Sequence, residues 1–151
     1  SDLDPMLVAR KMEINDNVIP ASNSVIANSL FDLAIILDNN YYKKMAITIL
    51  NNVKPKMSSY ASGYANYANL MLKIIHPYYE VAIVGEKAHE NALLIHQSYC
   101  PNKILLGSSQ ESQLSLLENR FVKDKTMIYV CENKVCQMPT LDINQAYKLL
   151  K

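Results

Sequence analysis

The sequence has no block of like charge longer than a pair. Fifteen basic and 14 acidic residues leave a net charge of +1. Binding to phosphates depends on clustered Lys and Arg side chains, which concentrate positive potential on one surface. This lack argues against a nucleic-acid partner and against a basic patch for membrane surfaces.

Long apolar runs are also missing. A membrane-spanning helix needs about 18 or more consecutive apolar residues. The longest apolar-rich stretch, residues 25–37, is interrupted by Asn28, Ser29 and Asp32, so we expect no membrane partner. The sequence starts at Ser1, without an initiator Met or the pattern of a secretory signal, which predicts an excised piece of a larger protein.

Cysteine is scarce, with three residues in the chain. Three cysteines are too few for a disulfide-framework domain, and an odd number cannot all pair within the chain. This favours a reducing, cytoplasmic location. Cys131 and Cys136 lie in a predicted hairpin, residues 129–139. If Asn133 and Lys134 form its two-residue turn, the two thiols face each other across the strands.

Three interpretations of this thiol pair are open. Free packed thiols, which behave as small apolar side chains, are favoured over a structural disulfide. Half of a zinc site is the weakest, because His76, His89 and His96 are scattered and Cys100 is alone. We therefore expect no metal site, and no sequence pattern predicts a cofactor.

What is present is ample apolar content, since half of the 151 residues are hydrophobic and can build a core. Residues 25–37, 41–53 and 56–75 have helical periodicity, with Pro55 predicted to end the second helix. Short apolar runs then alternate with helical patterns. The predicted strands are 79–84, 103–106 and 126–131, and the predicted helices are 88–99, 111–121 and 142–150.

This order predicts an α/β protein. N-terminal helices are followed by a small βαβαβ layer of parallel strands, with a C-terminal hairpin and helix at its edge. The change of period at residues 76–77 predicts two parts, a helical segment over 1–77 and a small α/β subdomain over 78–151. The three helices have wide apolar faces, so either further helices lie upstream or these helices cover one side of the sheet.

Glu13, Asp16 and Asn23 form the best candidate polar cluster. Two carboxylates three residues apart, beside the start of a helix, could bind a sugar hydroxyl or serve as acid and base. The alternative, which is favoured, is a loop whose Asp and Asn accept hydrogen bonds from backbone donors and cap the helix. Asn23 or Ser24 is the predicted cap.

Two further patterns have structural interpretations that are favoured over functional ones. Tyr60, Tyr64 and Tyr67 share one helical face and are typical of core packing rather than of a sugar-binding wall. Gly85 and Gly107 each follow a predicted strand, but they lack the three-glycine fingerprint and the phosphate loop of nucleotide-binding proteins. Ser108 and Glu111 have the spacing of a capping box for the helix over 111–121.

Two segments together resemble a known family. Residues 13–24 resemble a motif in which an acidic residue and an Asp precede a Pro-Ser-Gly-Asn-Ser run that starts a helix. Residues 130–142 resemble a C-terminal signature of two cysteines, a proline and a capping Asp. Both are similar to the YyaL-like, spermatogenesis-associated thioredoxin-domain proteins. One position departs from the motif, since Ser22 stands where the family has glycine.

The resemblance implies an architecture more than an activity. Such proteins carry a thioredoxin-like domain, then an α/α toroid similar to sugar epimerases and six-hairpin glycosidases. This chain would be the C-terminal portion, residues 1–77 would end the toroid, and the upstream toroid and thioredoxin-like domain would be its partners. The parent would act on a carbohydrate-like small molecule or in thiol redox chemistry. No Cys-x-x-Cys motif occurs in this chain.

Three functions are therefore open. The first is a C-terminal fragment that is noncatalytic in isolation. The second is a helical protein-interaction module, although no repeat of about 34 residues is found. The third is a nucleotide-binding α/β domain.

Overall fold

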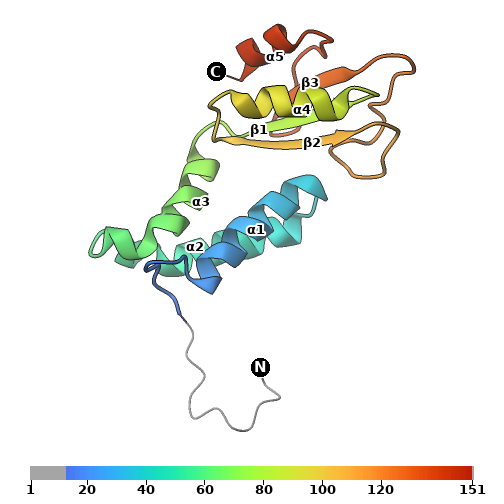
Figure 1. The fold of residues 1–151 in the computed structure, drawn as a ribbon. Helices are drawn as coiled ribbons and strands as arrows, with labels where there is room; N and C mark the ends of the chain where they lie inside the picture. The colour runs from blue at the N-terminus through green and yellow to red at the C-terminus, as the bar shows by residue number, and fades with distance from the viewer. Residues whose placement is uncertain (1–12, 151) are drawn as a thin grey trace, which may run out of the picture.

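The computed structural model describes residues 13–150, and it confirms an α/β protein in which N-terminal helices precede strands and a C-terminal helix (Figure 1). The helical part comprises α1 (Ser22–Ile36), α2 (Asn40–Met57), the 3-10 turn η1 (Ala61–Tyr64) and α3 (Ala65–Ile75). The remainder comprises β1 (Tyr79–Val84), α4 (Ala88–Gln97), β2 (Lys103–Ser108), β3 (Met127–Glu132), β4 (Val135–Cys136) and α5 (Ile143–Leu149).

The three N-terminal helices share one apolar core. Its buried members come from all three helices and from the segments around them: Ala27, Phe31, Ala46, Leu50, Val53, Tyr64, Tyr67, Leu70 and Tyr78. Tyr64 and Tyr67 therefore have the core positions that their spacing predicts, with ring centroids 6.0 Å apart. Tyr60 does not share this position, because its side chain is 56% exposed.

The second helix does not end at Pro55, as the sequence predicted. α2 continues through this proline to Met57, and η1 separates it from α3. Pro55 removes one backbone donor, which would have bonded to the carbonyl of Asn51. Both residues are exposed, so water can reach that carbonyl, and the helix ends two residues later.

The sheet is mixed, with strand order β2-β1-β3-β4. β1 and β2 are parallel and are connected through α4, but β3 is antiparallel to β1. The expectation of three parallel strands was therefore wrong for the third. Residues 111–121, predicted to be a helix, form turns instead.

The direction of β3 explains the missing helix. A strand that runs antiparallel to β2 starts at the end of the sheet where β2 stops, so no crossover helix is needed. The connection instead passes along the sheet and buries Leu116 and Leu117 against Ala82 and Val84. Glu111 accepts a hydrogen bond from the backbone of Asn119 (2.8 Å), and Ser108 caps no helix.

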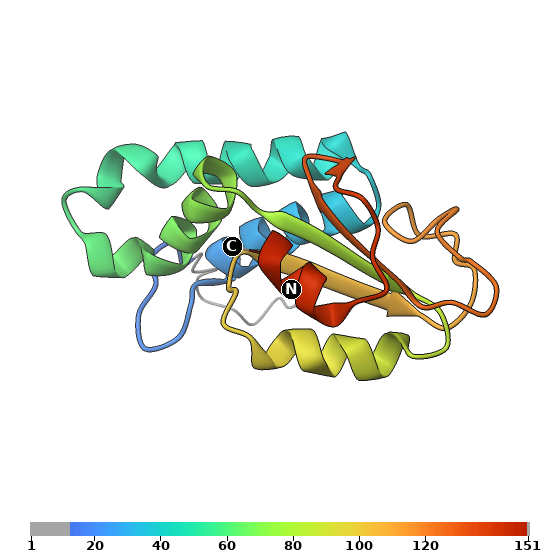
Figure 2. The same ribbon diagram turned by 90° about the horizontal axis from the view of Figure 1, so that it is seen from above.

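The central strand is covered on both faces, which explains its continuous apolar sequence. Val81 and Ile83 face a core built with α4 and α5, including Ala88, Ile95 and Ala146. Ala82 and Val84 face the 109–126 connection on the other side. Figure 2 shows α4 and α5 on one side of the sheet, with α1 and α2 beyond its other side.

Asp32 connects the helical part to the first strand. Its carboxylate accepts hydrogen bonds from Nζ of Lys73 on α3 (2.9 Å) and from the hydroxyl of Tyr78 (3.1 Å). Burial and the neighbouring Asp32 charge raise the pKa of Tyr78 above its ordinary value. The Tyr78 ring also packs edge-on against Phe31, with centroids 5.7 Å apart.

Within residues 13–150, no helix is long and apolar enough to cross a bilayer.

Two leucines of α3 differ in burial, so their replacement by alanine should lower the free energy of unfolding by very different amounts. Leu70→Ala removes a side chain with 0% exposure and should lower the free energy of unfolding by about 2–5 kcal/mol. Leu72→Ala, one half-turn along and 50% exposed, is the matched control and should cost under about 1 kcal/mol. Urea denaturation followed by circular dichroism measures both, and equal losses would contradict this core.

Candidate functional site

Asp16 is the centre of a buried polar network at the start of two helices. Its side chain is 6% exposed. Oδ1 accepts hydrogen bonds from the backbone of Ala21 (2.9 Å) and from the hydroxyl of Ser24 (2.6 Å). Oδ2 accepts one from the backbone of Asn66 (2.9 Å), which lies 50 positions away in α3. The carboxylate therefore joins the N-terminal ends of α1 and α3.

The cap of α1 differs from the predicted one. The helix begins at Ser22, with Ala21 as its N-cap, so Asn23 and Ser24 lie within the first turn. Asp16 accepts a hydrogen bond from the backbone N–H of the N-cap residue Ala21, one of the donors that the start of a helix leaves without an intrahelical partner. Ser22 is helical and is not among the positive-φ residues, so the replacement of glycine brings no strain there.

The other two members of the predicted cluster lie beside this network rather than in it. Glu13 is exposed, and its backbone carbonyl accepts a hydrogen bond from the side-chain amide of Asn23 (3.2 Å). The structure thus connects Glu13 with Asn23 through a main-chain oxygen. The two carboxylates do not share a hydrogen-bond partner among the described contacts. This arrangement supports the loop-and-cap interpretation better than paired acid–base carboxylates.

An open cleft of about 650 Å³ lies next to the Asp16 network. Its lining combines four amide side chains with a lysine and a histidine: Asn28, Asn66, Asn69, Leu72, Lys73, His76, Pro101 and Asn102. Asn28 donates to the backbone carbonyl of Asn66 (2.8 Å), and Asn66 donates to the hydroxyl of Ser24 (3.0 Å). The network therefore positions two of the cleft amides.

Sequence reasoning missed this cleft because its residues come from distant segments. Asn28 is visible in the sequence as a polar interruption of an apolar helix. Nothing in the sequence, however, connects it with Asn66 or with Asn102 beyond the first strand. Amide groups both donate and accept hydrogen bonds, as sugar hydroxyls require of a partner.

The hairpin forms with the predicted register. Cys131 pairs with Cys136 and Glu132 with Val135 across a turn at Asn133 and Lys134. Both turn residues have positive φ, as a two-residue type I′ turn requires. The favoured interpretation of free thiols was wrong, because Cys131 and Cys136 form a disulfide.

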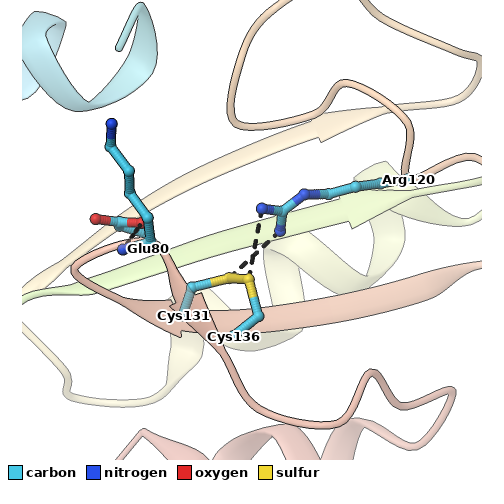
Figure 3. The surroundings of a disulfide bond; sticks show 5 residues. Glu80, Arg120, Cys131 and Cys136 are labelled. Atoms are coloured by element: carbon cyan, nitrogen blue, oxygen red, sulfur yellow. Dashed lines mark hydrogen bonds between the residues drawn. A yellow bond between two sulfur atoms is a disulfide. The ribbon is translucent and has the colours of Figure 1, made fainter.

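An arginine lies against this disulfide, as Figure 3 shows. Nη1 of Arg120 is 3.4 Å from Sγ of Cys131, and Nη2 is 3.5 Å from Sγ of Cys136. The guanidinium also lies over the ring of Tyr129, at 4.9 Å from its centroid. Partial burial lowers the pKa of Arg120 from its ordinary value, while the charges of Tyr129 and Glu80 oppose that effect.

Glu80 completes the surroundings of the disulfide. It pairs with Cys131 across β1 and β3, so both side chains share one face of the sheet. Glu80 is buried and accepts a hydrogen bond from the backbone of Lys134 (3.2 Å). The Nζ of Lys134 pairs with Asp38, beside the end of α1. The turn of the hairpin therefore contacts both the sheet and the helical part.

Gly85 follows β1 but has a packing role in this structure. Its φ is +136°, and a Cβ at this position would lie 2.3 Å from the backbone oxygen of Lys125. The glycine therefore allows the end of β1 to approach the chain entering β3.

Within the described part of the chain, no group of three or more His, Cys, Asp or Glu side chains could hold a metal ion.

The chain is similar over nearly its whole length to curated proteins named spermatogenesis-associated protein 20. The rat and mouse proteins are each 26% identical to it over 161 residues, and the human protein is 25% identical. The aligned region covers 99% of this chain and 20% of each relative. The chain thus spans about a fifth of the length of these relatives. No family model and no solved structure matches it.

Loss of the Asp16 carboxylate should destabilise the fold. Asp16→Ala leaves three donors without their acceptor, and we expect the free energy of unfolding to fall by about 2–4 kcal/mol. Glu13→Ala is the control and should change it by less than about 0.5 kcal/mol, because that side chain is exposed. Chemical denaturation measures both. Unchanged stability in Asp16→Ala would show that the network does not organise the helices.

Proposed function

We propose that this chain is the C-terminal portion of a larger protein related to spermatogenesis-associated protein 20, and that it is noncatalytic in isolation. Its role is to close a helical array of the parent protein. α1 is the helix that would pack against the upstream helices. The small sheet with α4 and α5 would form the outer end of that array.

The observation that carries this proposal is that α1 has apolar side chains both on its buried face and on the opposite, exposed face. Its buried face includes Ala27, Phe31 and Ala34, which pack within the helical part. The opposite face follows a row with a spacing of four, Val25, Ser29, Leu33 and the C-cap residue Leu37, with Ile26 beside it. Its four apolar members are between 40% and 50% exposed. A helix with apolar side chains on two opposite faces is typical of a position that is covered on both.

The length of the relatives supports a cover for this face from elsewhere in the parent protein. They are about five times as long as the matched region, so most of their sequence has no counterpart in this chain. In this proposal, the α/α toroid that the family resemblance implies would supply further helices upstream. The exposed apolar row of α1 lies beside the packed pair of α1 and α2, and it is a surface against which a neighbouring helix would pack.

Catalysis belongs to the parent in this proposal. Asp16, the best buried carboxylate candidate of the sequence, uses both oxygens to hold α1 and α3. The amide-rich cleft could contribute hydrogen bonds to a carbohydrate-like substrate, but a catalytic acid–base pair would have to come from upstream. The cytoplasmic location and the thioredoxin-like partner domain remain part of the same proposal.

A double substitution on the exposed face of α1 tests this role. Ile26→Ser with Leu33→Ser should cost the isolated chain little, because both side chains are already 40–50% exposed. In the full-length parent the same pair should lower the free energy of unfolding by about 2–4 kcal/mol, because a packed interface loses two apolar groups. Thermal and urea denaturation of both proteins measures the difference.

Leu93→Ser is the matched control, since Leu93 is an exposed leucine on α4, away from this face. It should have the same small effect in both proteins. If the double substitution is equally mild in the full-length parent, the face is not covered by upstream helices. That result would contradict the proposal and favour an interaction module for a separate partner.

A further inference from the structure

We propose that Cys131 and Cys136 form a reversible redox pair, in which an incoming thiolate attacks Cys136 and Arg120 stabilises the thiolate released at Cys131. The partner would be a dithiol, and the exchange would be stoichiometric. This inference rests on the hairpin and does not depend on the role proposed for α1. It assigns chemistry to a disulfide that otherwise has only a structural role.

The two sulfur-bearing residues differ in access. Cys131 is 1% exposed and lies on β3, between β1 and β4. Cys136 is exposed at the end of β4, the edge strand of the sheet. A thiolate from another molecule therefore reaches Sγ of Cys136 first. The rate of exchange depends on such access to the attacked sulfur.

Arg120 provides the charge that this reaction needs. Its two terminal nitrogens lie 3.4 and 3.5 Å from the sulfurs of Cys131 and Cys136. A nearby guanidinium lowers the pKa of a thiol by stabilising the thiolate, and a lower pKa makes that sulfur a better leaving group. The hydroxyl of Tyr129 donates to the backbone carbonyl of Arg120 (3.0 Å), which fixes the arginine in place.

Two other charged groups lie near the pair. Glu80 shares the face of Cys131, and its negative charge disfavours a thiolate there, so the guanidinium of Arg120 has to outweigh it through its direct contact with both sulfurs. The ammonium group of Lys134 pairs with Asp38 and not with a sulfur. Among the described contacts, the guanidinium of Arg120 is the charged group that touches both sulfur atoms.

The exchange balances in two steps. The first thiolate of the dithiol forms a bond to Sγ of Cys136, the Cys131–Cys136 bond breaks, and its electron pair remains on Sγ of Cys131 as a thiolate. The second thiol of the partner then loses its proton to solvent, and its thiolate attacks the partner's own sulfur in the mixed disulfide, so that Cys136 leaves as a thiolate. The partner leaves as a disulfide, the two electrons are on Cys131 and Cys136, and these thiolates take up from solvent the two protons that the partner released.

Equilibrium with glutathione tests whether the pair is redox-active. The intact chain is incubated in glutathione buffers of graded ratio, quenched in acid, alkylated with N-ethylmaleimide and weighed by mass spectrometry. Cys100 is a buried free cysteine, so the alkylation is carried out at neutral pH on the chain unfolded in denaturant, where Cys100 adds one label in every state. We expect two further labels to appear within the glutathione range while the circular dichroism stays native. Structural disulfides resist this reductant, so a pair that stays oxidised throughout would overturn the proposal.

Substitutions of Arg120 test the role of its charge. Arg120→Gln should lower the equilibrium constant for reduction about tenfold, which corresponds to about 30 mV for two electrons. Arg120→Lys keeps the charge and should recover part of that loss. Lys134→Gln is the control, because it removes a nearby charge that pairs with Asp38. An unchanged equilibrium in Arg120→Gln would contradict the assigned role.

Variants that keep one cysteine of the pair, together with the buried Cys100, test which of the two sulfurs another molecule reaches faster. In the Cys131→Ser variant, Cys136 remains, and it should react with a small aromatic disulfide at least about tenfold faster than Cys131 does in Cys136→Ser. The pH dependence of the Cys131 reaction should move upward when Arg120→Gln is added. Equal rates in the two variants, or an unmoved pH profile, would overturn the assignment.

Discussion

The buried carboxylate of Asp16 is the contact on which the helical part depends. It joins a loop to the first turns of α1 and α3, which are far apart in the sequence. Because Ser24 and Asn66 bond to each other within the same network, the carboxylate also helps to position two amides of the cleft, those of Asn28 and Asn66. The orientation of α1, and hence of its exposed apolar row, depends on the same anchor.

A second set of contacts joins the helical part to the sheet. Asp32 bonds to Lys73 and Tyr78 at the start of β1, while Lys134 in the hairpin turn pairs with Asp38 after α1. The hairpin is therefore a contact point between both parts of the chain as well as the edge of the sheet. A redox change at Cys131 and Cys136 would occur within a few residues of that contact.

The sequence predicted best what is decided locally. The turn at Asn133 and Lys134 fixes which residues face each other, so the pairing of Cys131 with Cys136 followed from counting outward. The oxidation state did not follow, because it depends on chemistry that spacing does not contain. The prediction of a helix over 111–121 was wrong because of the sheet topology. A crossover helix would be required only if β3 ran parallel to β2, and β3 runs antiparallel to it. Asp16 was recognised as a candidate, but its contact with Asn66 could not be read from a local pattern.

We propose that the exposed face of α1 is covered in the full-length parent. Hydroxyl-radical footprinting measures this directly, by comparing the oxidation rates of Ile26 and Leu33 in the isolated chain and in the parent, with Leu93 as reference. We expect several-fold slower oxidation of Ile26 and Leu33 in the parent and an unchanged rate for Leu93. Equal rates at Ile26 and Leu33 in the two proteins would contradict it.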